Sequence, residues 1–364
     1  MRRGKSKHRP RDDEMLYGGV YPFIQTGDIK KAYLYINEYE KTYSNYGLSQ
    51  SKLWKKGTLC ITIAANIAET AILSMDACFP DSVIGWCSNN QLTNNLFIKY
   101  YFDYYKEQLK RLSVGGAQEN LNLDKLEKIY FNIPSLQEQN NISNFLSKID
   151  ERIQTQIKII SDYKTLKKGI IQHIFNANAQ YSKVHLNIIL KEISKKNKRQ
   201  IHNNVLSISN SLGFIKQSEQ FVDREIASSN TSNYKIVNKN EYAYNPARIN
   251  VGSIARLTNY DCGIVSPMYT IFEINTTRII YEYFDYFLHS FTFQKQLNQR
   301  LEGSVRQCLT FNSMQNIEIE LPPIEVQIEI SKNMKHLDSK IKIESGYLNL
   351  LKSQKDYLLK NMFV

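Results

Sequence analysis

Basic side chains are the residues of this 364-residue chain whose types and spacing point most directly to a chemistry. Lys and Arg crowd the first eleven positions, and a second basic cluster, KKNKR, spans 195–199. The formal net charge is +12, with a pI near 9.2, which favours a polyanionic partner such as nucleic acid or an anionic surface. In such a complex Lys and Arg bind phosphates, while Arg, Gln and Asn can bind base edges. The alternative is a basic protein without such a partner.

The residues that we predict to face DNA come from both halves of the chain. Arg248 is the strongest single candidate, because it stands in an otherwise small and apolar stretch, YNPARINVGSIA; it could instead hold a loop by pairing with a carboxylate. Gln25 and Thr26 could equally form a polar turn at a strand end. For each basic residue the alternative is a solvated surface charge. The full set is Lys5, Lys7, Arg9, Arg11, Gln25, Thr26, Lys195, Lys196, Lys198, Arg199, Arg248 and Arg256.

Enzyme signatures are weak. The GKS sequence at 4–6 is similar to the end of a phosphate-binding loop, but it lacks the preceding strand and the first glycine, which favours a solvated basic arm. The NPAR sequence at 245–248 is similar to the Asn-Pro-Pro-aromatic box of amino-methyltransferases, yet it lacks the aromatic residue that would stack on a base. No His or carboxylate cluster has metal or acid–base spacing. We therefore expect neither catalysis nor a metal site.

Cysteine usage and hydropathy restrict the compartment. The five cysteines are odd in number and form no CxxC pair, which is typical of the reducing cytoplasm and argues against zinc. We expect them to be small core residues. No run of 18 apolar residues occurs, so we expect no membrane span. The opening MRRGKSKHRPRDDE has no apolar segment behind it, so we do not expect a signal peptide.

The elements that must position the basic residues follow from an internal repeat. Shifted by 188 residues, the stretch 134–175 aligns without a gap on 322–363. Apolar residues recur there at steps of three and four, which predicts one apolar stripe along a helix. A helix of about 40 residues spans roughly 60 Å, too long for one small domain, so we expect the two helices to bury their stripes on each other. The stripes are Ile142, Leu146, Ile149, Ile153, Ile160, Tyr163, Ile170 and Ile174, and Ile330, Met334, Leu337, Ile341, Leu348, Leu351, Leu358 and Met362.

Two positions of each stripe are polar and predict a register. They are Gln156 and Lys167 in the first copy, and Glu344 and Lys355 in the second. An antiparallel coiled coil with pseudo-twofold symmetry can place Lys167 opposite Glu344 and Gln156 opposite Lys355, because the residue numbers of both pairs then have the same sum. A polar pair in such a seam fixes register at some cost in stability. The alternative is that these positions lie in a splayed, wet part of the seam.

Each helix follows a segment with mixed strand and helix signals. The tetrapeptide YFDY at 101–104 returns at 283–286, a shift of 182 instead of 188, and the segment after GG at 115–116 matches the one after Gly303. We predict a mixed α+β fold in four parts: an α/β domain at 1–133, a helical region at 134–182, a second α/β domain at 183–321 and a C-terminal helical region at 322–364.

Two α/β domains at opposite ends of an antiparallel helix pair would present two modules at a fixed separation. Duplex DNA suits such a protein, because two modules on a rigid spacer can recognise two short half-sites with unread base pairs between them. The helices match in sequence whereas the domains differ, so we expect the two half-sites to differ.

The chain resembles the specificity (S) subunit of type I restriction-modification systems. The resemblance rests on SKHRPR and LYGGVYPFIQTGDI in the first domain, IAANIAETAIL after them, YNPARINVGSIA in the second domain, and a Pro-x-x-x-x-Gln helix start. That start is Pro134 with Gln139 in the first copy and Pro322 with Gln327 in the second. The resemblance implies that 1–133 and 183–321 are target recognition domains, each binding one half of a bipartite double-stranded DNA target.

The resemblance also implies partners and cofactors. The conserved helical regions would dock two methyltransferase (M) subunits, which would methylate adenine with S-adenosylmethionine. Restriction (R) subunits would translocate and cut DNA with ATP and Mg²⁺, and this chain would hold no cofactor. Family members usually carry an opening segment ahead of the SKHRPR-like stretch, and Ala68 stands where the second domain has Gly252, so that turn could differ. A stand-alone DNA-binding or regulatory protein and a structural coiled-coil scaffold remain alternatives.

Overall fold

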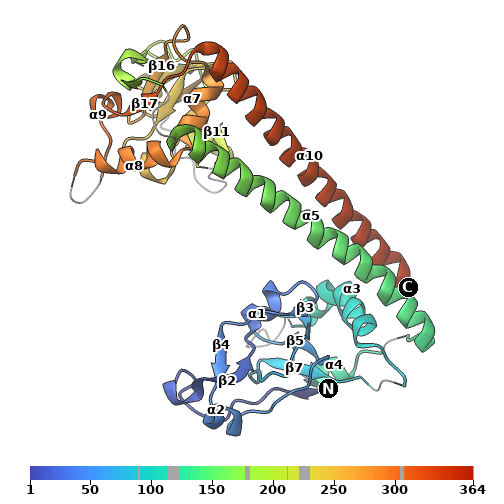
Figure 1. The fold of residues 1–364 in the computed structure, drawn as a ribbon. Helices are drawn as coiled ribbons and strands as arrows, with labels where there is room; N and C mark the ends of the chain where they lie inside the picture. The colour runs from blue at the N-terminus through green and yellow to red at the C-terminus, as the bar shows by residue number, and fades with distance from the viewer. Residues whose placement is uncertain are drawn as a thin grey trace. The chain divides into compact units, whose positions relative to one another are not determined.

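The chain forms two compact units. The computed structural model describes residues 1–88, 91–113, 121, 123–130, 132–176, 181–210, 212–220, 230–303 and 307–363. The first unit comprises Met1–Lys158 with Ser345–Val364, and the second comprises Ile159–Glu344. The GGAQ stretch at 115–118 and part of its counterpart, at 304–306, lie outside the described residues. Each unit combines an α/β domain with one half of each long helix (Figure 1).

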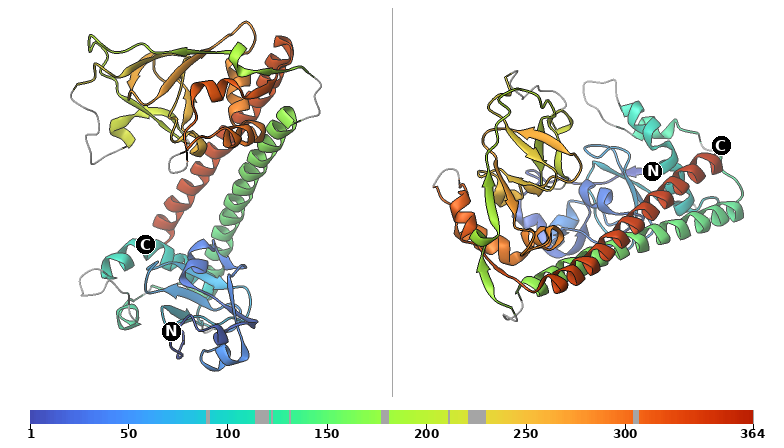
Figure 2. Two further views of the ribbon diagram at one scale, coloured as in Figure 1. Left: turned by 90° about the vertical axis from the view of Figure 1, so that its left-hand side faces the viewer. Right: turned by 90° about the horizontal axis from the view of Figure 1, so that it is seen from above.

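The two long helices are α5 (Leu136–Asn176) and α10 (Ile324–Met362). In both units one half of α5 runs antiparallel to one half of α10, and the paired halves lie side by side in every view of the second unit (Figures 1 and 2). Leu146 and Ile153 of the predicted stripe are fully buried in the first unit. Each such side chain contributes about 1.5–3 kcal/mol of hydrophobic stabilisation. The predicted helices and their antiparallel coiled-coil pairing are therefore confirmed.

The predicted register of the helix pair is wrong. Lys167 forms an ion pair with Asp338 in the second unit, and Lys355 forms one with Asp150 in the first, at 2.7 Å. Both observed partners lie six residues from the predicted ones. Glu344 instead pairs with Lys340 on its own helix. The prediction paired polar residues within the apolar stripe, whereas the aspartates lie beside it, where they also reach tyrosines of the α/β domains.

The first unit is built on a five-stranded sheet in the order β1-β7-β5-β6-β3. Only the β3–β6 pair is parallel. A separate two-stranded sheet pairs β2 with β4, and the helix α3 packs on the main sheet. The strands are β1 (Arg2–Arg3), β2 (Tyr17–Phe23), β3 (Tyr35–Ile36), β4 (Lys41–Tyr43), β5 (Leu59–Thr62), β6 (Thr70–Leu73) and β7 (Val83–Trp86). The helices are α1 (Thr26–Lys31), α2 (Asn45–Ser49), α3 (Asn95–Ser113) and α4 (Leu123–Glu127), with a short 3-10 turn at Glu14–Leu16.

The second unit is built on a four-stranded antiparallel sheet in the order β14-β13-β16-β9. Three two-stranded sheets pair β10 with β11, β12 with β15, and β17 with β8. The strands are β8 (Lys183–His185), β9 (Leu190–Ile193), β10 (Leu206–Ser209), β11 (Gly213–Lys216), β12 (Lys235–Asn238), β13 (Tyr242–Tyr244), β14 (Ile254–Arg256), β15 (Cys262–Val265), β16 (Thr270–Ile274) and β17 (Glu318–Glu320). The helices are α6 (Gln217–Gln220), α7 (Tyr281–Leu288), α8 (Phe291–Gln299) and α9 (Phe311–Gln315), with short 3-10 turns η2 (Leu186–Ile188) and η3 (Ile249–Val251).

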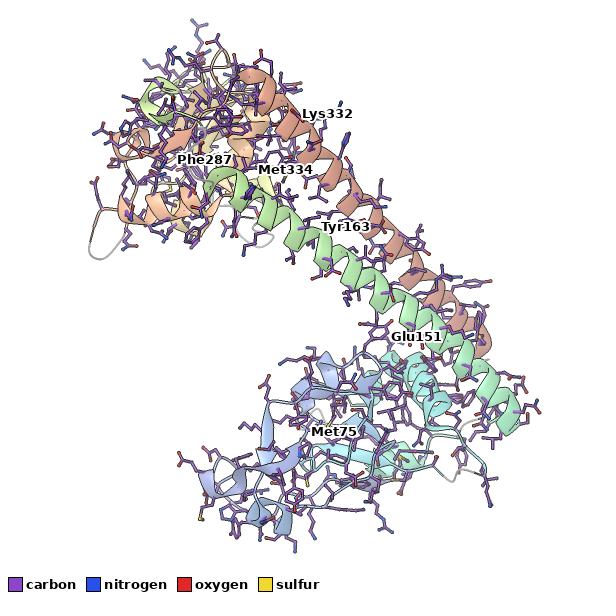
Figure 3. The ribbon with its side chains drawn as sticks, viewed as in Figure 1. Met75, Glu151, Tyr163, Phe287, Lys332 and Met334 are labelled. Carbon is purple, nitrogen blue, oxygen red and sulfur yellow. The ribbon has the colours of Figure 1, made fainter. Side chains whose placement is uncertain are left out.

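Helices α3 and α7 join each sheet to the long helices. In the first unit Phe97 and Tyr101 of α3 pack on Phe363, with ring centroids 5.2 and 5.5 Å away. In the second unit Tyr283 and Phe287 of α7 pack on Phe175 at 5.0 and 5.4 Å. Figure 3 shows Phe287 and Met334 where α7 meets the long helices.

These contacts correct the YFDY alignment. Tyr283 takes the place of Phe97, a shift of 186 rather than 182, so the identical letters are one helical turn out of structural register. An amphipathic helix keeps its apolar face when it is displaced by four residues, and the chance match of four letters hid that displacement.

Candidate nucleic-acid interface

One end of the sheet in the second unit gathers most of its predicted DNA-facing residues. Strands β9 and β13 both run antiparallel to β16. The turn after β9, the turn that joins β13 to β14 and the approach to β16 therefore emerge at the same end. We call this the loop end. The opposite end of β16 leads into α7 and hence to the long helices.

A buried asparagine shapes the basic turn after β9. Asn197 is 2% exposed, and its side chain donates to the carbonyl of His202 at 2.9 Å and accepts from the His202 N–H at 3.3 Å. Gln200 takes a left-handed backbone conformation, with φ of 51°. The turn is thereby closed around Asn197, and the basic residues on either side of it point to solvent. These exposed residues are Lys195, Lys196, Lys198 and Arg199.

The turn between β13 and β14 carries Arg248. Its side chain is exposed, and no hydrogen bond or ion pair of its guanidinium is seen within the described part of the chain. Its backbone is fixed, because its N–H donates to the carbonyl of Asn245 at 3.0 Å and its carbonyl accepts from Ser253 at 3.1 Å. The alternative in which Arg248 holds the loop through a carboxylate is therefore not what the structure shows.

Arg256 requires a correction. It was predicted to face DNA, but its side chain is only 12% exposed and its Nη2 lies 2.7 Å from Oδ2 of Asp285. Its guanidinium also donates to Asn240 at 3.1 Å and lies over the ring of Tyr281. Burial raises the pKa of Asp285, and Arg256 opposes that rise. Arg256 thus holds α7 against the sheet. In sequence it could not be told from an exposed arginine, because its carboxylate partner lies 29 residues away.

The first unit has an equivalent loop end. Strand β1 pairs antiparallel with β7, and β7 with β5, so the basic arm after β1 emerges beside the turn at 63–69 that joins β5 to β6. The Gly4 N–H donates to the carbonyl of Val83 at 2.8 Å. A Cβ at Gly4 would collide with the ring of Phe79 and the carbonyl of Pro80. Close packing therefore explains the glycine of the GKS sequence, while Lys5 and Lys7 are exposed.

The two arginines of the arm are partly engaged. Nη2 of Arg11 lies 2.9 and 3.0 Å from the two oxygens of Asp81, and Arg9 approaches the same carboxylate at 3.8 Å. About half of each arginine side chain remains exposed, at 52% for Arg11 and 54% for Arg9. The carboxylate orders the arm without burying its charge, so both arginines stay accessible.

Gln25 and Thr26 lie at the start of α1. The Gln25 N–H donates to the side chain of Asp28 at 2.8 Å, which is the geometry of a helix N-cap. Both residues are half-buried. The structure thus gives them a local capping role, as the alternative of a polar turn at a strand end anticipated.

The turn at 63–69 matches the turn at 247–253 in position but not in chemistry. Ala68 and Gly252 both adopt positive φ, 61° and 94°, so the two turns share a left-handed residue. Their hydrogen bonds differ, since the Ala68 N–H donates to Thr62 and the Gly252 N–H to Ile249. With these residues aligned, Ala64 of the first unit stands where the second has Arg248. The loop ends therefore offer different side chains.

A polar cluster that the sequence did not reveal joins each domain to the helix pair. In the first unit Asp150 is 2% exposed and accepts from Tyr33 at 2.9 Å, Tyr100 at 2.7 Å and Lys355 at 2.7 Å. Burial and the Asp150 carboxylate raise the pKa of Tyr100 far above its usual value, so its hydroxyl stays protonated and donates.

The second unit repeats this cluster in a more open form. Tyr286 donates to Asp338 at 3.1 Å, and Asp338 pairs with Lys167. The side chains of Lys167 and Asp338 are 27% and 42% exposed, whereas those of Lys355 and Asp150 are 12% and 3% exposed. The equivalent aspartates and lysines are each 188 residues apart, which is the period of the helical repeat. A search for charged residues at that period could have found them.

The Pro-x-x-x-x-Gln motif has a structural explanation. Gln139 is completely buried; its Oε1 accepts the N–H of Asn94 at 3.0 Å, and its Nε2 donates to the carbonyls of Leu92 and Pro134 at 3.0 and 2.9 Å. Gln327 is also completely buried and makes the equivalent bonds to Ile280, Arg278 and Pro322 at 3.0, 3.0 and 2.8 Å. Each glutamine therefore binds the chain at the start of α3 or α7 to the start of a long helix.

The cysteines are only partly core residues. Cys60 and Cys78 are buried as predicted, Cys87 is exposed, and Cys262 and Cys308 are half-buried. Over the described ranges, no three His, Cys, Asp or Glu side chains group as metal ligands. Within the same ranges, no helix combines the length and apolar composition that a membrane span requires.

The fold and the two loop ends define a class of protein: tandem α/β units that share a pair of long helices and present basic, dissimilar loops. The chain belongs to the family of type I restriction modification DNA specificity domains, whose sequence profile matches residues 4–162 and 158–353.

Two curated relatives are named as type I restriction enzyme specificity subunits. One, from Methanocaldococcus jannaschii, is 27% identical over 154 residues, which are 42% of this chain and 35% of that protein. The other, from Haemophilus influenzae, is 31% identical over 139 residues, which are 36% of this chain and 34% of that protein. The matches thus span about a third of the length of these relatives.

Two solved structures share the fold along the whole chain. The S subunit of a type I restriction-modification system from M. genitalium covers 100% of this chain and 93% of its own, with a TM-score of 0.56 and 16% identity. A chain from a study of complex assembly and conformational transition in a type I system covers 100% and 95%, with a TM-score of 0.60 and 13% identity.

Proposed function

We propose that this chain is the DNA specificity subunit of a type I restriction-modification complex and that each unit binds one half of a bipartite duplex target. One observation carries the proposal: the same end of the sheet presents exposed basic residues in both units, while the turns beside them differ. Repeated scaffolds with dissimilar loops suit two dissimilar half-sites. Family membership supports this function and gives no support to a stand-alone regulator or a scaffold.

The long helices are the proposed docking surface for two methyltransferase subunits. Large apolar side chains stay exposed on both of them, including Phe145 at 48%, Leu166 at 51%, Leu350 at 69% and Tyr357 at 67%. Exposed apolar surface on a helix of a water-soluble assembly supports contact with another protein. In the proposed complex, S-adenosylmethionine, ATP and Mg²⁺ are held by the methyltransferase and restriction subunits in the cytoplasm, and this chain contributes recognition without catalysis.

The decisive experiment is methylation-sensitive sequencing of the host genome with the gene intact, deleted and restored on a plasmid. We expect an adenine-methylated motif with two defined parts and an unspecified spacer. It disappears on deletion and returns on complementation. Adenine methylation that is unchanged by the deletion would refute the proposal, and binding of duplex DNA by the purified chain would then separate a stand-alone DNA-binding protein from a scaffold.

A further inference from the structure

An exposed patch surrounds the turn at 245–253 in the second unit. Val251 is 56% exposed and Met268 is 61% exposed, although both are large apolar residues. Arg248 and Val251 lie at the start and end of the 3-10 helix η3, three residues apart. Side chains three residues apart in a 3-10 helix project from the same face. Met268 lies beside the turn, since the side-chain amide of Asn245 lies 3.6 Å from its sulfur. One cationic and two apolar side chains are thus presented together.

The turn that carries the patch is rigid. The side-chain oxygen of Asn245 accepts from the Ala247 N–H at 3.1 Å, and Ile249 is 1% exposed in the core. The Pro246 carbonyl accepts from the Leu309 N–H at 3.1 Å. Gly252, with φ of 94°, closes the 3-10 turn by donating its N–H to Ile249 at 2.9 Å. Preorganised side chains lose little conformational entropy on binding, so exposed apolar residues on this turn suit recognition.

Phosphate-binding residues lie close to the patch. The basic turn at 195–199 follows β9, which is two strands from β13 in the sheet, or about 10 Å away. Both turns belong to the loop end. Lysines beside a patch of one arginine and two apolar residues are typical of a DNA interface in which phosphate contacts position the protein and base contacts specify the sequence.

We propose that Arg248, Val251 and Met268 form the base-reading surface of the second unit. The proposal rests on the proposed function and names its chemistry. Arg248 donates two hydrogen bonds to O6 and N7 of a guanine in the major groove, and the apolar pair contacts the 5-methyl group of a neighbouring thymine. The equivalent turn of the first unit has Ala64 in place of the arginine, so this guanine contact belongs to one half-site only.

Base analogues test the surface one atom at a time. The full chain, with any subunits that co-purify, is titrated with duplexes that carry the motif defined by methylation sequencing. In one duplex series 7-deazaguanine removes a guanine N7, and in the other uracil removes a thymine methyl. We expect wild-type affinity to fall about tenfold at one guanine and about fourfold at an adjacent thymine. Arg248→Ala abolishes the first penalty, and Val251→Ala with Met268→Ala abolishes the second.

Two exposed residues at the opposite end of the same sheet provide matched controls. Arg278→Ala removes an exposed arginine, and Ile188→Ala removes an apolar side chain that is 41% exposed; both should retain the wild-type penalties. Penalties that are equal in wild type and patch variants, or a target with no adjacent guanine and thymine in either half-site, would overturn the assignment. The proposed function would still stand if the wild type bound its bipartite motif, and would fail if no such motif existed.

Discussion

Replacing Asp150 by Ala tests the physical account of how the first unit is held on the helix pair. The Asp150 carboxylate is the shared acceptor of two tyrosine hydroxyls and one lysine, and 2% of the residue is exposed. Without it, Lys355 keeps a charge that is 12% exposed and has lost its counter-ion. Asp338→Ala is the matched change in the second unit, where the pair is 27% and 42% exposed.

The expected magnitudes differ because the burial differs. Breaking a buried ion pair by removing one partner costs about 3–5 kcal/mol, so this is the loss that we expect for Asp150→Ala. A solvated pair contributes at most about 1 kcal/mol, and the hydrogen bond from Tyr286 adds about 1 kcal/mol. We therefore expect about 1–2 kcal/mol for Asp338→Ala. With an m-value of about 2 kcal/mol/M, the two urea midpoints should shift by about 1.5–2.5 M and 0.5–1 M.

Tryptophan fluorescence isolates the first unit. The chain has two tryptophans, and both Trp54 and Trp86 lie in the first unit. Urea unfolding followed by their emission should show the large shift for Asp150→Ala and little change for Asp338→Ala, whereas circular dichroism reports on both units. Lys355→Met combined with Asp150→Ala should recover at least about 1 kcal/mol, because it removes the stranded charge.

Two results would refute this reasoning. One is a shift for Asp150→Ala no larger than the shift for Asp338→Ala, each measured by circular dichroism. The other is strict additivity of Asp150→Ala and Lys355→Met, because residues in one ion pair must show a coupling energy.

Three further predictions concern other parts of the molecule. Gln139→Leu should cost about 2–4 kcal/mol in the tryptophan transition, because it leaves buried backbone groups unpaired, while Gln327→Leu should leave that transition in place and lower the stability seen by circular dichroism; equal effects of both variants on tryptophan emission would contradict this. Ala65→Gly should raise the free energy of unfolding by up to about 1 kcal/mol, because Ala65 is exposed with φ of 62°; a lower urea midpoint would count against the strain. Lys196→Ala should reduce the slope of log affinity against log salt by about one, whereas Arg256→Ala should lower stability and leave the slope unchanged, which a salt titration of DNA binding can check.

The sequence was sufficient for the long helices and for the duplication. Apolar steps of three and four depend only on helix geometry, and a repeat of 188 residues is visible without knowledge of the fold. The pairing register was not accessible in the same way. It depends on Asp150 and Asp338, which lie beside the apolar stripe and gain their importance from tyrosines at distant positions in sequence.

The candidate site was predictable in composition more than in geometry. Clusters such as 195–199 are exposed, as charge alone suggested. Arg256 shows the limit, because a single arginine after an apolar strand can face solvent or a buried carboxylate, and only the tertiary fold brings Asp285 to it. Val251 and Met268 were missed for the opposite reason: apolar residues are assigned to a core by default, and their exposure becomes evident only when the turn is seen at the sheet end.

Binding to duplexes in which one half of the methylated motif is scrambled tests the central claim most directly. The purified chain, with its co-purifying subunits, is titrated with the intact motif, with either half scrambled, and with the spacer changed by one base pair. The account predicts that each scrambled half and the altered spacer lower the affinity by at least two orders of magnitude, toward non-specific binding. An affinity that depends on one half alone would contradict the account.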